Sequence, residues 1–175
     1  MNIPNLLTIL RFMLIPVMSY FLFNENLILA LIIYVIASIT DVIDGFIARR
    51  FNMITNLGKV LDPLADKLLQ FSALIGLSII NIIPYWIVVI FTLKEVIMAL
   101  GAVKLLQKDI IIQAKWFGKV STVIFFIAII ISMLSRILGI SNTYPIMLMC
   151  FALLMTFFAL VMYILSYIKA LKNAD

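Results

Sequence analysis

Six long apolar stretches make up most of this chain, and they limit the possible folds more than any other feature. They lie roughly at residues 5–23, 27–48, 60–80, 83–106, 116–138 and 144–168. A helix needs about 20 apolar residues to cross a bilayer. Hydrophobic residues make up 66% of the 175 positions and charged residues 12%, which is more apolar surface than a soluble domain of this size can bury. We therefore expect a single domain over residues 1–175, an all-α, polytopic membrane protein with six transmembrane helices.

Basic residues are concentrated at alternate connections between these stretches. The second connection and its flanks, the fourth connection and its flanks, and the C-terminus carry ten of the thirteen: Arg49, Arg50, Lys59, Lys67, Lys104, Lys108, Lys115, Lys119, Lys169 and Lys172. The opposite connections are flanked only by Arg136. By the positive-inside rule, we predict that both termini and the second and fourth connections face the cytoplasm.

Four of the eight acidic residues lie in one short segment, residues 40–67. Asp41 and Asp44 are three apart at the end of one predicted helix, and Asp62 and Asp66 are four apart at the start of the next, so each pair shares a helix face. A carboxylate at the bilayer centre costs about 2.5–3.5 kcal/mol even on insertion scales. We therefore expect the four to converge in a wet cavity near the cytoplasmic interface. Topology alone does not explain them, because acidic residues contribute little to it.

The rest of the composition narrows the chemistry of this acidic segment. The chain has no histidine, and its single cysteine, Cys150, lies in an apolar run. The absence of histidine excludes imidazole catalysis and histidine metal sites, Cys150 is expected to be a lipid- or core-facing residue, and a nucleic-acid partner is not expected. Four carboxylates make a hard oxygen site, which suits Mg²⁺ or Mn²⁺ best and Ca²⁺ less well. Small residues beside them, Gly45, Ala48 and Gly58, allow close approach of a ligand or helix, while Arg49 and Lys67 border the acidic face.

Written as a pattern, the segment is D-x-x-D-G-x-x-A-R, then eight residues, then G-x-x-x-D-x-x-x-D, running from Asp41 to Asp66. This pattern resembles the signature of the CDP-alcohol phosphotransferase family. "NIPNLLTILR" near the start and "LDPLADK" at 61–67 are similar to its phosphatidylglycerophosphate synthase and cardiolipin synthase branches. The resemblance covers essentially the whole chain.

The resemblance implies a transferase that moves a phosphatidyl group from CDP-diacylglycerol to an alcohol and releases CMP at a cytoplasm-facing active site. It also implies a homodimer and two divalent ions, Mg²⁺ or Mn²⁺, with Asp66 as the general base. The implied metal ligands are Asp41, Asp44, Asp62 and Asp66. The implied donor-binding residues are Asn5, Thr8, Asp41, Gly45, Ala48, Arg49 and Gly58.

The acceptor is less defined by the sequence. A phosphorylated acceptor needs cations, and the candidates are Lys94, Lys119, Lys104 and Lys115. Lys94 adjoins Glu95 within a predicted span, where an ionisable pair is usually functional, although such a pair can also simply join helices. Phosphatidylglycerophosphate synthases tend to have Arg-Glu here and another Arg eight residues later, whereas this chain has Lys94-Glu95 and Ala102. We expect glycerol 3-phosphate as acceptor, with phosphatidylglycerol, the acceptor of cardiolipin synthases, as the alternative.

Two other classes of protein compete with this interpretation. A cation transporter would use the aspartates as an ion path, but such groups usually lie near the midplane and between matching broken helices. A structural membrane protein gives no reason for the aspartate pattern. Release of CMP from CDP-diacylglycerol distinguishes the enzyme from both.

Overall fold

The computed structural model describes residues 3–51, 58–106 and 116–172, without the side chains of a few residues near the ends of these ranges. Within these residues the fold is entirely helical, as predicted. The helices are α1 (Ile3–Phe23), α2 (Leu27–Arg50), α3 (Gly58–Ile79), α4 (Tyr85–Leu106), α5 (Trp116–Ile137) and α6 (Thr143–Lys172). Each agrees with a predicted apolar stretch to within a few residues.

Four of these helices are long and apolar enough to cross a membrane. The candidate spans are Pro4–Phe23, Leu27–Ala48, Val120–Ile137 and Thr143–Leu165, in α1, α2, α5 and α6. Among the described residues, α3 and α4 contain no further candidate membrane spans. Helix α3 carries three charged residues, Asp62, Asp66 and Lys67, within its first half. The chain is therefore an all-α membrane protein, and the number of six spans stays a prediction.

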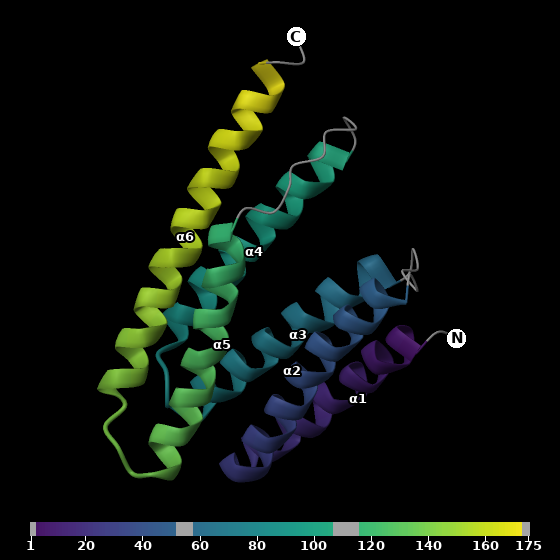
Figure 1. Cartoon of the computed structure of the whole chain (residues 1–175). Helices are drawn as coiled ribbons and strands as arrows, with labels where there is room; N and C mark the ends of the chain where they lie inside the picture. The colour runs from purple at the N-terminus through teal and green to yellow at the C-terminus, as the bar shows by residue number, and fades with distance from the viewer. Residues whose placement is uncertain (1–2, 52–57, 107–115, 173–175) are drawn as a thin grey trace.

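Among the described residues, short turns join α1 to α2, α3 to α4 and α5 to α6. Asn26 caps α2 by accepting a hydrogen bond from the Leu29 backbone N–H at 3.3 Å. Asn81 and Gly139 take left-handed conformations, with φ of 56° and 68°, which asparagine and glycine tolerate best. The described turns lie at one end of the bundle, whereas α1, α3 and α5 begin, and α2, α4 and α6 end, on the opposite side (Figure 1).

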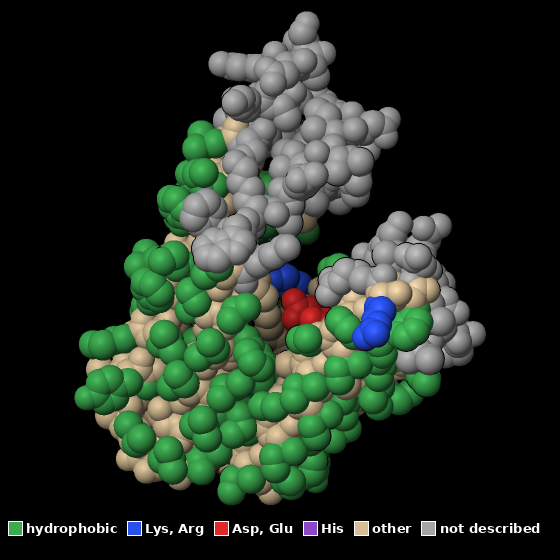
Figure 2. Space-filling model, viewed as in Figure 1, with side chains coloured by type: hydrophobic (Ala, Val, Ile, Leu, Met, Phe, Trp, Pro, Cys, Tyr) green, Lys and Arg blue, Asp and Glu red, His purple; other side chains and the backbone are tan. Residues whose placement is uncertain are grey.

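Two groups of helices meet along α2, α3 and α5. Helix α1 packs along α2 and α3 to form one group, and α5 packs along α6 in the other. The two groups are joined where α2 and α3 contact α5 (Figure 1). Phe91 of α4 lies against Phe125 of α5, with 4.8 Å between ring centroids. The face in Figure 2 is largely apolar, but acidic and basic side chains gather in a hollow between the two groups of helices. The acidic segment thus lies at the junction of the bundle.

Candidate active site

Helix α1 supplies a cation that joins two of the motif aspartates. Arg11 is fully buried. Its Nη1 lies 2.7 Å from Oδ1 of Asp41, and its Nη2 donates a hydrogen bond to Oδ2 of Asp44. Asp44 is itself 2% exposed. The guanidinium therefore compensates two carboxylates of α2 that would otherwise repel each other.

The same face of α1 also contacts the first aspartate of α3. The hydroxyl of Thr8 lies 2.5 Å from Oδ1 of Asp62 and 3.1 Å from the carbonyl oxygen of Pro4. Thr8 and Arg11 are three residues apart, so they project from one face of the helix. Helix α1 therefore contacts three of the four motif aspartates, which gathers the ends of α2 and α3 into one site.

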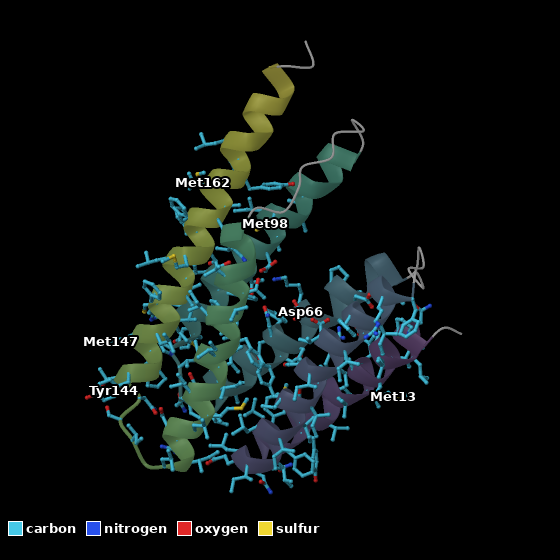
Figure 3. The ribbon with its side chains drawn as sticks, in the orientation of Figure 1. Met13, Asp66, Met98, Tyr144, Met147 and Met162 are labelled. Atoms are coloured by element: carbon cyan, nitrogen blue, oxygen red, sulfur yellow. The ribbon has the colours of Figure 1, made fainter. Side chains whose placement is uncertain are left out.

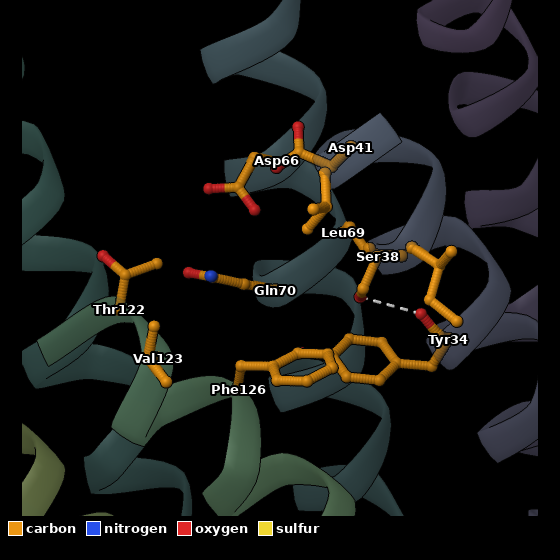
Figure 4. A pocket seen from close by; sticks show the side chains of 11 residues that line it. Tyr34, Ser38, Asp41, Asp66, Leu69, Gln70, Thr122, Val123 and Phe126 are labelled. Carbon is orange, nitrogen blue, oxygen red and sulfur yellow. Dashed lines mark hydrogen bonds between the residues drawn. The ribbon is translucent and has the colours of Figure 1, made fainter. Parts of the chain in front are cut away.

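Asp66 is the aspartate that helix α1 does not engage. No hydrogen bond or ion pair of its carboxylate occurs among the described residues. Its side chain lies between the two groups of helices (Figure 3), at a cavity of about 240 Å³ between α2, α3 and α5. Asp41 lines the same cavity, together with Ser38 and Gln70 (Figure 4). Asp66 therefore lines the cavity without a hydrogen-bonding or ion-pairing neighbour among the described residues.

A second charged cluster lies between α3 and α4. Glu95 accepts from Nζ of Lys94 at 2.5 Å and from Nζ of Lys67 at 3.1 Å through the same carboxylate oxygen. The Lys94 ammonium also lies 5.2 Å from the ring centroid of Phe91. Lys67, expected to border the aspartates, therefore pairs with Glu95. The Lys94–Glu95 contact that the sequence left open is present, joined by a second lysine.

Comparison with known proteins shows the family of this chain. The sequence profile of the CDP-alcohol phosphatidyltransferase family matches residues 1–169. The chain belongs to this family. A probable phosphatidylglycerophosphate synthase of Mycobacterium tuberculosis is 36% identical over 134 residues, which cover 73% of this chain and 64% of that protein. The chain thus spans less than two thirds of that relative's length.

Other similar proteins have names that specify the acceptor. A CDP-diacylglycerol–glycerol-3-phosphate 3-phosphatidyltransferase of Aquifex aeolicus is 32% identical over 148 residues, covering 83% of this chain and 80% of that protein. A Bacillus subtilis protein of the same name is 35% identical, covering 69% of this chain and 70% of the protein.

Among the described residues, the acidic side chains have the chemistry of a divalent-metal site but are not arranged as one. In this described part of the chain, no group of three acidic or thiol side chains is arranged to hold a metal ion. Arg11 contacts Asp41 and Asp44, and Thr8 contacts Asp62. The donor set nevertheless consists of carboxylates only, which Mg²⁺ and Mn²⁺ prefer. One guanidinium contacts both Asp41 and Asp44, so a positive charge already lies between these two carboxylates.

Other residues predicted for the candidate site fall into two groups. Helices α1, α2 and α3 place Asn5, Gly45, Ala48 and Gly58, with Gly58 buried and the other three partly exposed. Lys115 lies outside the described residues, and the side chains of Arg49, Lys104 and Lys119 are also outside the description, although their helices are not. Their predicted roles stay predictions.

The sequence interpretation did not include several residues that the fold brings to the site. The sequence does point to Arg11, because a charged residue inside an apolar span is by default a candidate functional residue. It also points to Gln70, since Gln70 lies four residues after Asp66 and so shares its helix face. It does not point to Tyr34 or Thr122, because their place at the cavity depends on how α2 and α5 pack.

Proposed function

We propose that this chain transfers the phosphatidyl group of CDP-diacylglycerol to glycerol 3-phosphate and releases CMP. The observation that carries the proposal is the gathering of Asp41, Asp44 and Asp62 around helix α1, with Asp66 left uncommitted at a cavity, in a member of the CDP-alcohol phosphatidyltransferase family. The names of the Aquifex aeolicus and Bacillus subtilis relatives favour glycerol 3-phosphate as the acceptor.

The reaction needs one base and one displaced group. Asp66 accepts the proton of the acceptor hydroxyl, whose oxygen attacks the phosphorus attached to diacylglycerol. A new P–O bond forms, and the bond between that phosphorus and the bridging oxygen of CMP breaks, so that CMP leaves with the electron pair. Asp66 suits this role because no neighbour among the described residues engages its carboxylate, and general base catalysis requires an accessible group.

The aspartates are proposed to bind two divalent ions, Mg²⁺ or Mn²⁺. When bound, such ions neutralise a pyrophosphate and stabilise the charge that develops during phosphoryl transfer. The ligands would be the carboxylates of Asp41, Asp44, Asp62 and Asp66. Arg11 adds a permanent positive charge beside the first two, which further suits an anionic donor.

The acceptor phosphate is proposed to bind near the charged cluster of α3 and α4. Lys67 and Lys94 meet on the single carboxylate of Glu95, so this cluster has a net positive charge and can attract an anion. Lys104, Lys115 and Lys119 remain further candidates. Phosphatidylglycerol is the second possible acceptor, favoured by Lys94 and Ala102, which depart from the pattern of phosphatidylglycerophosphate synthases.

The proposed orientation places both termini and the active site on the cytoplasmic side, as the distribution of basic residues indicates. A homodimer is also proposed, on the family resemblance alone.

A product assay tests the proposal directly. Purified protein receives CDP-diacylglycerol, Mg²⁺ or Mn²⁺, and either glycerol 3-phosphate or phosphatidylglycerol, and the lipid products are identified by mass. We expect CMP release that depends on glycerol 3-phosphate and stops with EDTA. CMP release with phosphatidylglycerol alone would assign the acceptor differently, and no CMP release with any acceptor would refute the enzyme.

The proposed base has its own test in the same assay. Asp66→Asn keeps the size of the side chain but removes its basicity, so turnover should fall about 10²–10⁴-fold, the usual contribution of general base catalysis. Glu25→Gln, in the exposed turn between α1 and α2, is the matched control and should retain turnover. Near-normal turnover of Asp66→Asn would show that another group takes the proton.

A further inference from the structure

The cavity beside Asp66 contains a polar group that the fold leaves without a partner. Tyr34 of α2 is fully buried, and its hydroxyl has no hydrogen-bond partner among the described residues. Its ring stacks on Phe126 of α5, with 5.5 Å between centroids. Burying an unpaired hydroxyl is unfavourable, so packing within the protein alone does not explain a hydroxyl group at this position.

The residues that line the cavity change from acidic at one end to apolar at the other. Asp41 lies at one end, and Tyr34 is seven residues earlier on α2, about 10 Å along the helix axis at 1.5 Å per residue. Gln70, 4% exposed, lies one turn after Asp66 on α3 and projects between the aspartates and the aromatic rings (Figure 4). The amide of Gln70 has no hydrogen bond within the described part of the chain. Two uncommitted donors therefore lie at successive depths below the carboxylates.

The cavity is also bordered by side chains on the outer surface of the bundle. Ile39 and Val42 of α2 and Val123 of α5 line it, and they are 51%, 70% and 56% exposed. In a membrane, surfaces of this kind face lipid. A molecule in the cavity can therefore extend from the aspartates into the acyl region of the bilayer without leaving the protein surface.

We propose that this cavity binds the diacylglycerol part of the lipid donor, with the hydroxyl of Tyr34 and the amide of Gln70 donating hydrogen bonds to its ester carbonyls. This inference rests on the proposed function. A diacylglycerol phosphate has the matching order of groups: a phosphate, then ester carbonyls that can only accept hydrogen bonds, then apolar chains. Tyr34 and Gln70 can each donate one bond, and the apolar walls suit the first carbons of the acyl chains.

The experiment compares two donors on the purified full chain. One is CDP-diacylglycerol, and the other is its dialkyl ether analogue, which has the same headgroup and chain length but no carbonyl oxygens. For the wild type, we expect the KM of the ether donor to be about 3- to 10-fold higher, the effect of losing one net hydrogen bond, with little change in kcat. Equal KM values for the two donors would overturn the inference without any variant.

The variant Tyr34→Phe removes only the hydroxyl and keeps the stacked ring. It should raise the KM of the ester donor about 3- to 10-fold and leave the KM of the ether donor unchanged, since that donor offers no carbonyl. Donor-free protein should melt about 2–4 °C higher, because an unpaired buried hydroxyl is gone. A purely structural role would raise both KM values alike, and that result would overturn the inference.

Two further variants sharpen the comparison. Gln70→Met should raise the KM of the ester donor and leave that of the ether donor unchanged, as Tyr34→Phe does. A KM of the ester donor equal to that of the wild type would overturn the assignment of Gln70 to the binding site. Tyr20→Phe is the matched control, because Tyr20 is 64% exposed on α1 and lies outside the cavity. The results distinguish the two proposals. No CMP release from either donor would refute the proposed enzymatic function. CMP release with equal KM values for the ester and ether donors would refute only this binding site.

Discussion

The charge balance of the site depends on Arg11 more directly than on any other described residue. Its side chain is fully buried, and it contacts the carboxylates of both Asp41 and Asp44. Removing one member of a buried ion pair typically costs about 3–5 kcal/mol, because the remaining charge is left uncompensated. Two carboxylates would be left here, which is an unfavourable arrangement unless another cation takes the place of the guanidinium.

This arrangement predicts opposite effects of Arg11→Met with and without metal. In EDTA the variant should melt well below the wild type, because Asp41 and Asp44 lose their shared cation. Added Mn²⁺ should then raise its melting temperature more than that of the wild type, since the ion no longer competes with a guanidinium. The measurement is thermal unfolding in detergent, with Arg136→Met, an exposed arginine, as the control.

Two results would count against this role for Arg11. One is an unchanged melting temperature of Arg11→Met in EDTA, which would mean that the ion pairs contribute nothing to stability. The other is an equal Mn²⁺ shift in both proteins, which would mean that the metal ions do not use Asp41 and Asp44. Thermal shifts do not depend on turnover, so they report on the site separately from activity.

At the scale of the helices, α1 is the element that sets the geometry of the site, and it does so by packing very closely on α3. Leu22 of α1 is fully buried, and a Cβ built on Gly76 of α3 would lie 2.1 Å from its Cδ2. An alanine at this position would therefore require the Leu22 side chain to move. The same packing brings Thr8 near Asp62, so the contact between Leu22 and Gly76 supports the site from the far end of both helices.

We predict that Gly76→Ala destabilises the protein by about 1–3 kcal/mol, the usual effect of overpacking a well-packed core. The added methyl group must push Leu22 aside and separate α1 from α3. Gly101→Ala in α4 is a matched control, because its Cβ would meet only the ring edge of Tyr163 at 3.3 Å and alanine favours a helix by up to about 1 kcal/mol. Thermal unfolding of both variants tests this; equal stability of Gly76→Ala and wild type would contradict it.

The helices themselves were predictable because each is an apolar stretch of about 20 residues, the length that a membrane-spanning helix needs. The faces that carry the aspartates were also predictable, since they follow from spacing within one helix. The contacts that these side chains make with residues of other helices were not predictable. That Arg11 meets Asp41, or that Lys67 meets Glu95, depends on how separate helices cross, and spacing along the sequence does not determine a crossing. Tyr34 looks like any buried aromatic residue until the neighbouring helices are in place.

At the scale of the whole molecule, the two ends of the bundle differ in charge. The described turns between α1 and α2, between α3 and α4, and between α5 and α6 lie at one end (Figure 1), where Arg136 is the only basic residue among the described ones. The acidic site lies toward the other end, where α2 ends at Arg50 and the first half of α3 carries Lys67. By the positive-inside rule, this asymmetry predicts that the basic end faces the cytoplasm.

The orientation leads to a labelling prediction. In a Cys150→Ser background, Glu25→Cys and Asn81→Cys lie in the turns at the end predicted to be outside, and both native residues are exposed. Phe51→Cys lies at the C-terminal end of α2, close to the acidic site, and Phe51 is 60% exposed. A membrane-impermeant thiol reagent should label the first two in intact cells and label Phe51→Cys only after the membrane is opened. Labelling of Phe51→Cys in intact cells, with protection of the other two, would put the aspartates on the outer face. CMP would then be released away from the cytoplasm, and the proposed orientation would be wrong even if the assigned reaction were right.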